Sequence, residues 1–572
     1  MSRPLPLVLC VLGATLMAAA GHSRLAGSSG DPEWPSAQSA PLPPEARQKV
    51  DQVFAAFTKS PSPGCAVAIY RNGEIAYARG YGLASLEHSV PITPRTVFDL
   101  GSTSKQFTAF SVLLLEREGR LSLDDDVRKF VGELPQYERP ITIRHLVQHT
   151  SGLRDYLTLF ALSGVKTESW TTQQEAVRLA ARQREANFGA GDEWLYSNTG
   201  YLLLAEIVQR ASGKSLKDFA RERIFEPLGM VHTFFLDDHT LVVPGRAMGY
   251  GARAGGFQVD MSNFEQVGDG AVQTTVEDLL LWDRNFYAPK VGDAALLERA
   301  QQAGILRDGR PLDYAAGLMI GEYRGLRTVR HGGSWAGYRA DLVRYPTERT
   351  SIACLCNLSS ADPSRLADQV ADVVLAGVLK PVPAAARAAA LSPVSLTEQE
   401  LRGFEGVYRS ADGRQFARVQ VGAGKATWRG RTPMTPVGPN RFTLGNSGAE
   451  LVFAPGGPGG ARECRTLPPP GSKAAPVSFT RLAPVAATDH LEDYAGAYNA
   501  DELDVVWTFS VKDDALVMGI RGDTGEPFVR VDRDTFIQDT GLIVEFGREG
   551  NVVTGGRLHA GRVRNLRFKR AS

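Results

Sequence analysis

Several features that would assign a chain to a specialised class are missing from this sequence. The 572 residues carry 64 Lys and Arg against 63 Asp and Glu, so no charge excess is available to hold nucleic acid or an anionic membrane. Five cysteines are too few for a disulfide scaffold. With 43% apolar and 22% charged residues the chain has a globular composition, and its length predicts two to four domains.

Long hydrophobic runs are also missing, apart from one at the N-terminus. The apolar stretch from Leu5 to Ala20 follows Arg3, ends in small residues and is too short to span a bilayer. It predicts a signal peptide over residues 1–20, a flexible leader over 21–41, and an exported protein, periplasmic or extracellular, without a stable membrane anchor. Cys10 follows Leu9 rather than a small residue, which does not fit a lipoprotein site. A mitochondrial transit peptide is the alternative.

The other cysteines are Cys65, Cys354, Cys356 and Cys464. Cys354 and Cys356 alternate on a predicted strand over 351–358, so both point to one face, as small buried hydrophobes do. We therefore expect buried free thiols. A bridge from Cys65 to that strand stays open, because sequence alone does not give the distance.

Residues 42–379 combine helical and strand patterns. An apolar helical spacing over 44–59 precedes a predicted hairpin, with strands at 65–70 and 74–78 around the turn Asn72-Gly73. A helix-rich stretch follows from Ser104, then strands near 327–330, 338–344 and 351–358, then a helical run over 363–379. Strands near both ends with helices between them predict one α+β unit.

Residues 380–395 predict a linker, and beyond it the chain becomes strand-like and repeats. Phe404-Glu405-Gly406-Val407-Tyr408 recurs as Tyr494-Ala495-Gly496-Ala497-Tyr498, a period of about 90 residues, which suits a small β-barrel rather than a solenoid unit. We expect two small antiparallel β-barrel-like domains, at 396–484 and 485–572. One larger sandwich is the alternative.

The motif with the clearest chemistry is Gly101-Ser102-Thr103-Ser104-Lys105, which opens an apolar helical run. A Ser at a helix N-terminus with Lys three residues later places both groups on one face. A hydroxyl becomes a good nucleophile when a neighbour takes its proton, and the helix dipole favours the oxyanion that develops. Ser-x-x-Lys is also common by chance, with a serine merely capping the helix.

Two further motifs stand later in the chain. Tyr196-Ser197-Asn198 precedes an apolar helix and offers a phenol to relay a proton and an amide to donate; its alternative is a plain helix cap. His331-Gly332-Gly333-Ser334 runs from a strand into what we expect to be a Gly-rich turn, where backbone N–H groups approach a substrate closely. Its alternative is an ordinary hairpin turn.

In this order and spacing, the three motifs resemble the serine β-lactamase and penicillin-binding protein superfamily, in the branch of class C β-lactamases, D-aminopeptidases, DD-carboxypeptidases and esterases. The resemblance covers about residues 42–378 and implies an α+β catalytic domain with an antiparallel sheet and helices. It implies that Ser102 forms an acyl-enzyme, with Lys105 and Tyr196 sharing the proton transfers. Asn198, His331 and Gly333 then bind substrate, and the N–H groups of Ser102 and Ser334 form the oxyanion hole.

One departure from the family pattern affects the expected substrate. His331 and Gly332 stand where many relatives have Lys and Thr or Ser, so the site loses a permanent cation and a hydroxyl for a substrate carboxylate. We therefore expect a peptidase or amidase of the D-aminopeptidase or DD-carboxypeptidase type, acting on a small molecule or short peptide that contains D-amino acids. An esterase, a β-lactamase and an acylatable peptidoglycan sensor are the alternatives.

The tail supports this expectation, because D-aminopeptidases of the family resemble this layout, with a tail loop reaching the active site. The turn over 521–526, with its carboxylates, is our candidate for that loop. We expect no cofactor and no metal: His145 and His149 have a spacing seen in zinc sites but lack the Glu of the metalloprotease motif. We expect no nucleic-acid partner, and the oligomeric state is left open.

Overall fold

The computed structural model describes residues 41–59, 61–381, 393–445, 448–456, 460–468, 475–485 and 490–571. The predicted signal peptide, nearly all of the predicted leader and most of the predicted linker lie outside these residues. The domain boundaries drawn from the sequence stay predictions. None of the helices described has the length and hydropathy needed to cross a membrane.

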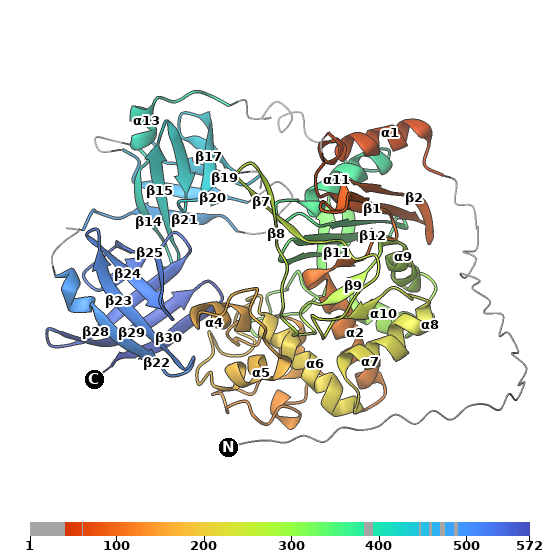
Figure 1. Ribbon diagram of the computed structural model, residues 1–572, viewed down its shortest axis with the longest axis horizontal. Coiled ribbons are helices and arrows are strands. Elements are labelled where there is room, and N and C mark those ends of the chain that lie inside the picture. Colours follow the sequence, from red (N-terminus) through yellow and green to blue (C-terminus); the bar gives the residue numbers. More distant parts are fainter. Residues whose placement is uncertain are drawn as a thin grey trace, which may run out of the picture. The chain divides into compact units, whose positions relative to one another are not determined.

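The N-terminal region is built on a six-stranded antiparallel sheet with the order β10-β11-β12-β13-β1-β2 (Figure 1). The predicted hairpin is present: Asn72 and Gly73 have φ of 54° and 80°, the positive values that a two-residue turn between twisted strands requires. The strands are β1 (Cys65–Arg71), β2 (Glu74–Tyr81), β10 (Met319–Tyr323), β11 (Leu326–Trp335), β12 (Tyr338–Tyr345) and β13 (Thr350–Cys356).

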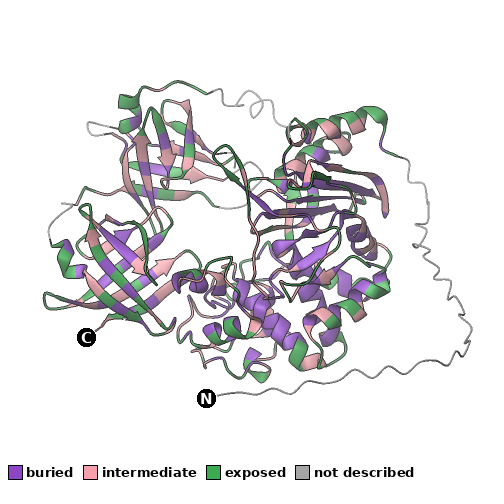
Figure 2. Ribbon diagram, viewed as in Figure 1, coloured by how far each residue is buried: buried purple, intermediate pink, exposed green. Residues whose placement is uncertain are grey.

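Helices cover both faces of this sheet, which is why strands β1 and β13 are buried along nearly their whole length (Figure 2). Along β1, Ala66, Ala68 and Tyr70 pack into one core with α2 (Lys105–Arg117), α6 (Asn198–Ser212) and α9 (Val276–Asn285). The alternate residues Val67 and Ile69 pack against α1 (Pro44–Val53) and α11 (Pro363–Val374). The two-residue period of the strand thus divides its side chains between two cores.

Smaller elements complete this region around the sheet. They include helices α3 (Ile143–Val147), α4 (Tyr156–Leu162), α5 (Gln173–Ala181), α7 (Leu216–Ala220), α8 (Glu226–Leu228) and α10 (Ala294–Ala300), and strands β3 (Leu83–Ser85), β4 (Val90–Pro91), β5 (Phe98–Asp99), β6 (Phe234–Phe235), β7 (Tyr250–Arg253), β8 (Gly256–Val259) and β9 (Val272–Thr274). With this mixture the predicted α+β class is confirmed.

The expected Gly-rich turn after His331 is wrong. Residues 331–335 continue strand β11, which pairs with β12 from Val329↔Arg344 to Trp335↔Tyr338, and the chain turns only at Ala336 and Gly337. The glycines serve close packing instead: a Cβ on Gly333 would lie 1.8 Å from the carbonyl oxygen of Leu100. Glycine in a strand often marks such an approach of another backbone.

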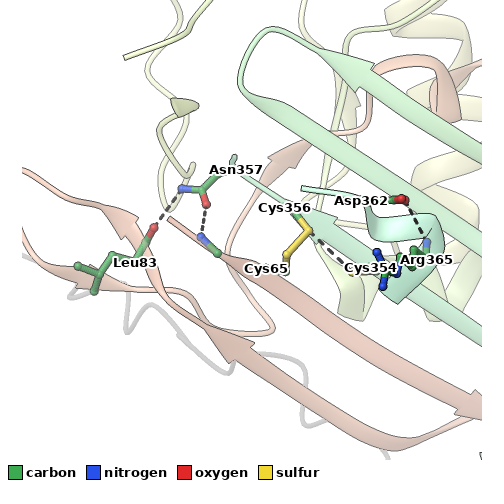
Figure 3. The surroundings of a disulfide bond; sticks show 8 residues. Cys65, Leu83, Cys354, Cys356, Asn357, Asp362 and Arg365 are labelled. Atoms are coloured by element: carbon green, nitrogen blue, oxygen red, sulfur yellow. Dashed lines mark hydrogen bonds between the residues drawn. A yellow bond between two sulfur atoms is a disulfide. The ribbon is translucent and has the colours of Figure 1, made fainter. Parts of the chain in front are cut away.

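The expectation of free thiols is wrong for Cys65 and Cys356, which form a disulfide (Figure 3). The two residues face each other in the register of β1 and β13, which sequence does not reveal. Cys354 and Cys464 are free and buried, and the Cys354 Sγ lies 3.8 Å from that of Cys356. Beside the disulfide, the Asn357 amide accepts from the Gly64 N–H at 2.8 Å and donates to the Leu83 carbonyl at 3.0 Å.

After α13 (Glu398–Arg402), the tail forms two barrel-like sheets, so the single large sandwich is wrong. The first is a closed barrel of β14 (Gly406–Ser410), β15 (Phe416–Gly422), β16 (Lys425–Trp428), β17 (Thr432–Gly438), β18 (Arg441–Leu444), β19 (Glu450–Phe453), β20 (Glu463–Leu467) and β21 (Val477–Arg481). The second is a nearly closed nine-stranded sheet of β22 (Gly496–Ala500), β23 (Val505–Lys512), β24 (Ala515–Ile520), β25 (Asp523–Pro527), β26 (Val529–Arg530), β27 (Thr535–Ile537), β28 (Leu542–Glu549), β29 (Val552–Ala560) and β30 (Val563–Arg570).

The sequence repeat has a structural counterpart in these two barrels. The Tyr408 hydroxyl donates to the Phe404 carbonyl at 2.7 Å, and the Tyr498 hydroxyl donates to the Tyr494 carbonyl at 2.9 Å. Each motif therefore has the same hydrogen bond at the start of its barrel, from a buried tyrosine hydroxyl to the carbonyl four residues earlier.

The second barrel shares its apolar core with the helical side of the N-terminal region. The indole N–H of Trp507 donates to the Leu162 carbonyl at 2.9 Å. Arg154, with no exposed side-chain surface, pairs with Glu502 at 2.5 Å and donates to the Asn565 carbonyl at 2.9 Å. Without Glu502 of the second barrel, the Arg154 charge would be buried without a partner, which would lower the stability of the fold. The second barrel is therefore an integral part of the folded unit.

Candidate active site

Ser102 and Lys105 lie where β5 gives way to α2, through a short 3₁₀ turn over Gly101–Ser104. The Lys105 Nζ donates to the Ser102 Oγ at 3.0 Å, to the Asn198 Oδ1 at 2.9 Å and to the Asp269 carbonyl at 2.5 Å. An ammonium has three hydrogens, so each of them has an acceptor. The buried lysine is thereby held within hydrogen-bond reach of a partly exposed serine hydroxyl.

Tyr196 and Asn198 stand immediately before and at the start of α6, and both face this lysine. The backbone N–H of Asn198 donates to the Asp155 carboxylate at 2.7 Å, which fixes the start of α6, and the Asn198 Oδ1 accepts from Lys105. The Tyr196 ring centroid lies 4.9 Å from the Lys105 Nζ. The Tyr196 hydroxyl is buried and has no hydrogen-bond partner among the described residues, so its proton and lone pairs are uncommitted.

Strand β11 forms the wall opposite Ser102. The Thr103 hydroxyl donates to the His331 carbonyl at 3.0 Å, tying the 3₁₀ turn to the strand. Gly101, at φ 49°, brings its backbone so close that a Cβ there would lie 2.7 Å from the Ser334 N. Without a Cβ on Gly101 and Gly333, the backbones carrying Ser102 and Ser334 approach each other on one side of the site.

His331 is buried and neutral. Its Nε2 lies 3.0 Å from the Tyr314 hydroxyl and its Nδ1 lies 2.6 Å from the Gly332 carbonyl, so Nδ1–H donates and Nε2 accepts. Burial, with a smaller effect of the Lys105 charge, lowers the pKa of His331 to about 3. The residue in the position of the usual lysine therefore contributes no positive charge.

Asp269 is a further residue that contacts Lys105. Its carbonyl accepts from Lys105, and its carboxylate oxygens lie 3.2 and 3.3 Å from the Tyr156 hydroxyl. Burial raises the pKa of Asp269 to about 6, against the opposing effect of the Lys105 charge. Asp269 was not among the residues predicted from the sequence, because its contact with Lys105 joins segments far apart in the chain.

Six of the seven predicted site residues line one cavity of about 790 Å³, and the seventh, Lys105, binds Ser102 from behind it. The six are Ser102, Tyr196, Asn198, His331, Gly333 and Ser334. A tail residue also lines this cavity, but the predicted loop over 521–526 does not. Asp523 and Glu526 of that loop pair with Lys166 and Arg431 instead. The tail residue is Arg562, from the turn between β29 and β30.

Arg562 and Asp155 also escaped the sequence analysis. Nothing in the local sequence around Arg562 marks it, because its place depends on how the second barrel packs. Asp155 caps α4 and accepts a hydrogen bond from the Asn198 N–H. His145, the metal candidate, caps α3 through Thr142, and His149 packs at 4.2 Å from the Tyr196 ring. The two histidines thus have separate structural roles.

A serine nucleophile and a lysine base at the start of a helix, facing strand β11 of an antiparallel sheet, define a serine hydrolase of the β-lactamase fold. The family model described as Beta-lactamase matches residues 50–376. The chain belongs to the Beta-lactamase family.

Full-length relatives extend the similarity into the tail. A D-aminopeptidase of Gluconobacter oxydans (strain 621H) is 27% identical over 536 residues, covering 91% of this chain and 98% of that protein. Penicillin-binding protein 4* of Bacillus subtilis (strain 168) is 32% identical over 305 residues, 50% of this chain and 66% of that protein. The octameric penicillin-binding protein homologue from Pyrococcus abyssi has a similar fold, with a TM-score of 0.55 at 24% identity, covering 83% of this chain and 97% of that one.

Proposed function

We propose that this protein is an exported serine peptidase or amidase of the D-aminopeptidase type. The observation that carries the substrate class is the similarity to the Gluconobacter D-aminopeptidase, which covers 91% of this chain and therefore includes both barrels. The observation that carries the chemistry is the contact of 3.0 Å between the Lys105 Nζ and the Ser102 Oγ. The fold alone would leave the substrate open, since one fold hosts many functions.

In this proposal Lys105 gives up one proton before the reaction and acts as a free amine. The Ser102 Oγ then attacks the substrate carbonyl, and its proton passes to the Lys105 Nζ and on through the Tyr196 hydroxyl. Tyr196 is suited to that relay because its buried hydroxyl is uncommitted. The N–H groups of Ser102 and Ser334 stabilise the oxyanion, and the relayed proton protonates the leaving amine. Water then hydrolyses the acyl-enzyme and regenerates Ser102. The amide of Asn198, whose Oδ1 is held by Lys105, donates from Nδ2 to the substrate.

The test compares the purified protein with its Ser102→Ala variant on D-Ala and L-Ala p-nitroanilides, a p-nitrophenyl ester and a chromogenic cephalosporin. We expect cleavage of the D-anilide in preference to the others, and loss of all turnover in Ser102→Ala to below about 1% of wild type with the fold intact. Turnover of the ester or the cephalosporin alone would make the protein an esterase or a β-lactamase. Acylation without turnover would make it a sensor.

Export is the second part of the proposal. The buried disulfide between Cys65 and Cys356 supports it, because disulfides persist in oxidising compartments such as the periplasm. The N-terminal pattern at 1–20 supports it independently. Mass spectrometry of the protein from fractionated cells tests it: a mature chain that begins near residue 21 in the exported fraction is expected. An intact N-terminus with the protein confined to the cytoplasm would contradict it.

A further inference from the structure

The turn that carries Arg562 is clamped by its backbone to the catalytic region. The Arg562 carbonyl accepts from the Asn187 Nδ2 at 2.9 Å and from the Asp155 N–H at 3.4 Å. Two residues later, the Arg564 N–H donates to the Asn187 Oδ1 at 2.7 Å. These bonds fix where the turn enters the cavity without using the Arg562 side chain.

The guanidinium of Arg562 has room for a further partner besides Asp155. It lines the cavity, with its side chain 43% exposed and its Cζ 4.8 Å from the centre of the Tyr196 ring. Asp155 is its one nearby carboxylate among the described ion pairs, at 3.8 Å, beyond hydrogen-bond distance. The Asp155 oxygens already accept from Asn198 and Thr158. Arg562 has no side-chain hydrogen bond within the described part of the chain.

Three of the other cations at this cavity already have hydrogen-bond or ion-pair partners. Lys105 spends its hydrogens on Ser102, Asn198 and Asp269, and Arg330 pairs with Asp341 and Asp368. Arg339 donates to the Ala336 and Tyr338 carbonyls. Arg246 also lines the cavity, and the carboxylate on which its charge acts is Asp99. Of these cations, Arg562 is the one that lies against the Tyr196 ring without a side-chain hydrogen bond to the described residues.

We propose that Arg562, supplied by the second barrel, binds the carboxylate of the substrate and takes the place of the cation that His331 does not provide. This deepens the proposed function, on which it rests, by naming the preferred substrate: a short D-peptide with a free carboxylate, rather than its amide. A guanidinium presents a planar fork that matches a carboxylate with two parallel hydrogen bonds. The same charge repels a substrate ammonium, so the amine is held elsewhere.

Binding to an inactive protein tests this without relying on turnover. In the Ser102→Ala background, titration calorimetry compares D-Ala-D-Ala with D-Ala-D-Ala amide. We expect the acid to bind at least about 10-fold more tightly, and the preference to weaken at high salt because the guanidinium is solvent-accessible. Adding Arg562→Gln should abolish the preference, and Arg562→Lys should keep part of it. Arg557→Gln, an exposed arginine of β29 that does not line the cavity, is the matched control and should leave it unchanged.

Equal affinity for the acid and the amide would overturn the proposal, and so would a failure to detect binding of either. A preference for the acid that survives Arg562→Gln would overturn it as well. Melting temperatures of the variants verify that each is folded. The outcome is separable from the proposed function: if the acid preference holds while Ser102-dependent cleavage of the D-anilide is absent, the aminopeptidase assignment fails and the carboxylate site stands. If cleavage is present and the preference is absent, only the carboxylate site fails.

Discussion

At the scale of single residues, burial decides what charge each group contributes to the site. The buried Lys105 Nζ donates to the Ser102 Oγ, the Asn198 Oδ1 and the Asp269 carbonyl. The nitrogens of His331 contact the Gly332 carbonyl and the Tyr314 hydroxyl, and burial keeps the imidazole ring neutral. A neutral imidazole in place of a lysine moves the recognition of anions away from strand β11.

The neutral state of His331 makes stability depend on pH. Its pKa is about 3 in the folded protein and about 6.5 in the unfolded chain, so the unfolded chain takes up the proton first. The contribution of His331 is fully present above pH 6.5 and is lost as the pH falls toward 3. Relative to His331→Gln, the wild type should lose about 2 kcal/mol of unfolding free energy between pH 7 and pH 5. Urea titrations at both pH values measure it.

The exposed His88 provides the control for this experiment. His88→Gln should follow the wild type at both pH values. The same pH dependence in wild type and His331→Gln would contradict the neutral, buried state of His331.

At the scale of elements, the site depends on how closely strand β11 approaches the turn that carries Ser102. Two positions without a Cβ, Gly101 and Gly333, make that approach possible. The bond from the Thr103 hydroxyl to the His331 carbonyl then holds the strand at that distance. Backbone N–H groups stabilise the oxyanion only while they stay at hydrogen-bond distance from it, so a shift of the strand would weaken that stabilisation.

Gly333→Ala should therefore separate the strand from the turn, because its Cβ would lie 1.8 Å from the Leu100 carbonyl oxygen. We expect kcat/KM to fall by about 100-fold, the effect of a displacement on the order of 1 Å. Gly332→Ala is the matched control, since its nearest neighbours lie 3.6 Å away, and it should retain nearly wild-type kinetics. Equal kinetics in the two variants would show that the close approach has no role in catalysis.

At the scale of the whole molecule, the second barrel and the catalytic region share one apolar core. Arg154 lies in that interface with no exposed side-chain surface and relies on Glu502 for its charge partner. Because Arg154 precedes Asp155, the interface also supports the residue that orients Asn198 and lies beside Arg562. The tail thus contributes to the site as well as to stability.

Glu502→Gln should lower the free energy of unfolding by about 3 kcal/mol, because it leaves the Arg154 charge buried without its partner. Asp504→Asn is the control: Asp504 pairs with Arg182 at an exposed position, 78% and 51% accessible, and its loss should cost less than about 0.5 kcal/mol. Chemical denaturation followed by tryptophan fluorescence measures both. Equal stabilities would mean that Arg154 does not depend on Glu502.

Sequence by itself determined the local parts of this protein. Helix, hairpin and repeat follow from periodicity and turn residues, and Ser102, Lys105, Tyr196 and Asn198 could be named because they stand within short motifs. Tertiary structure alone decided what depends on distant segments: the register that pairs Cys65 with Cys356, the close approach that the glycines of β11 serve, and the entry of Arg562 into the cavity. The physical reason is that local spacing constrains neighbours along the chain, whereas register, close packing and the charge of a cavity arise between residues far apart in sequence.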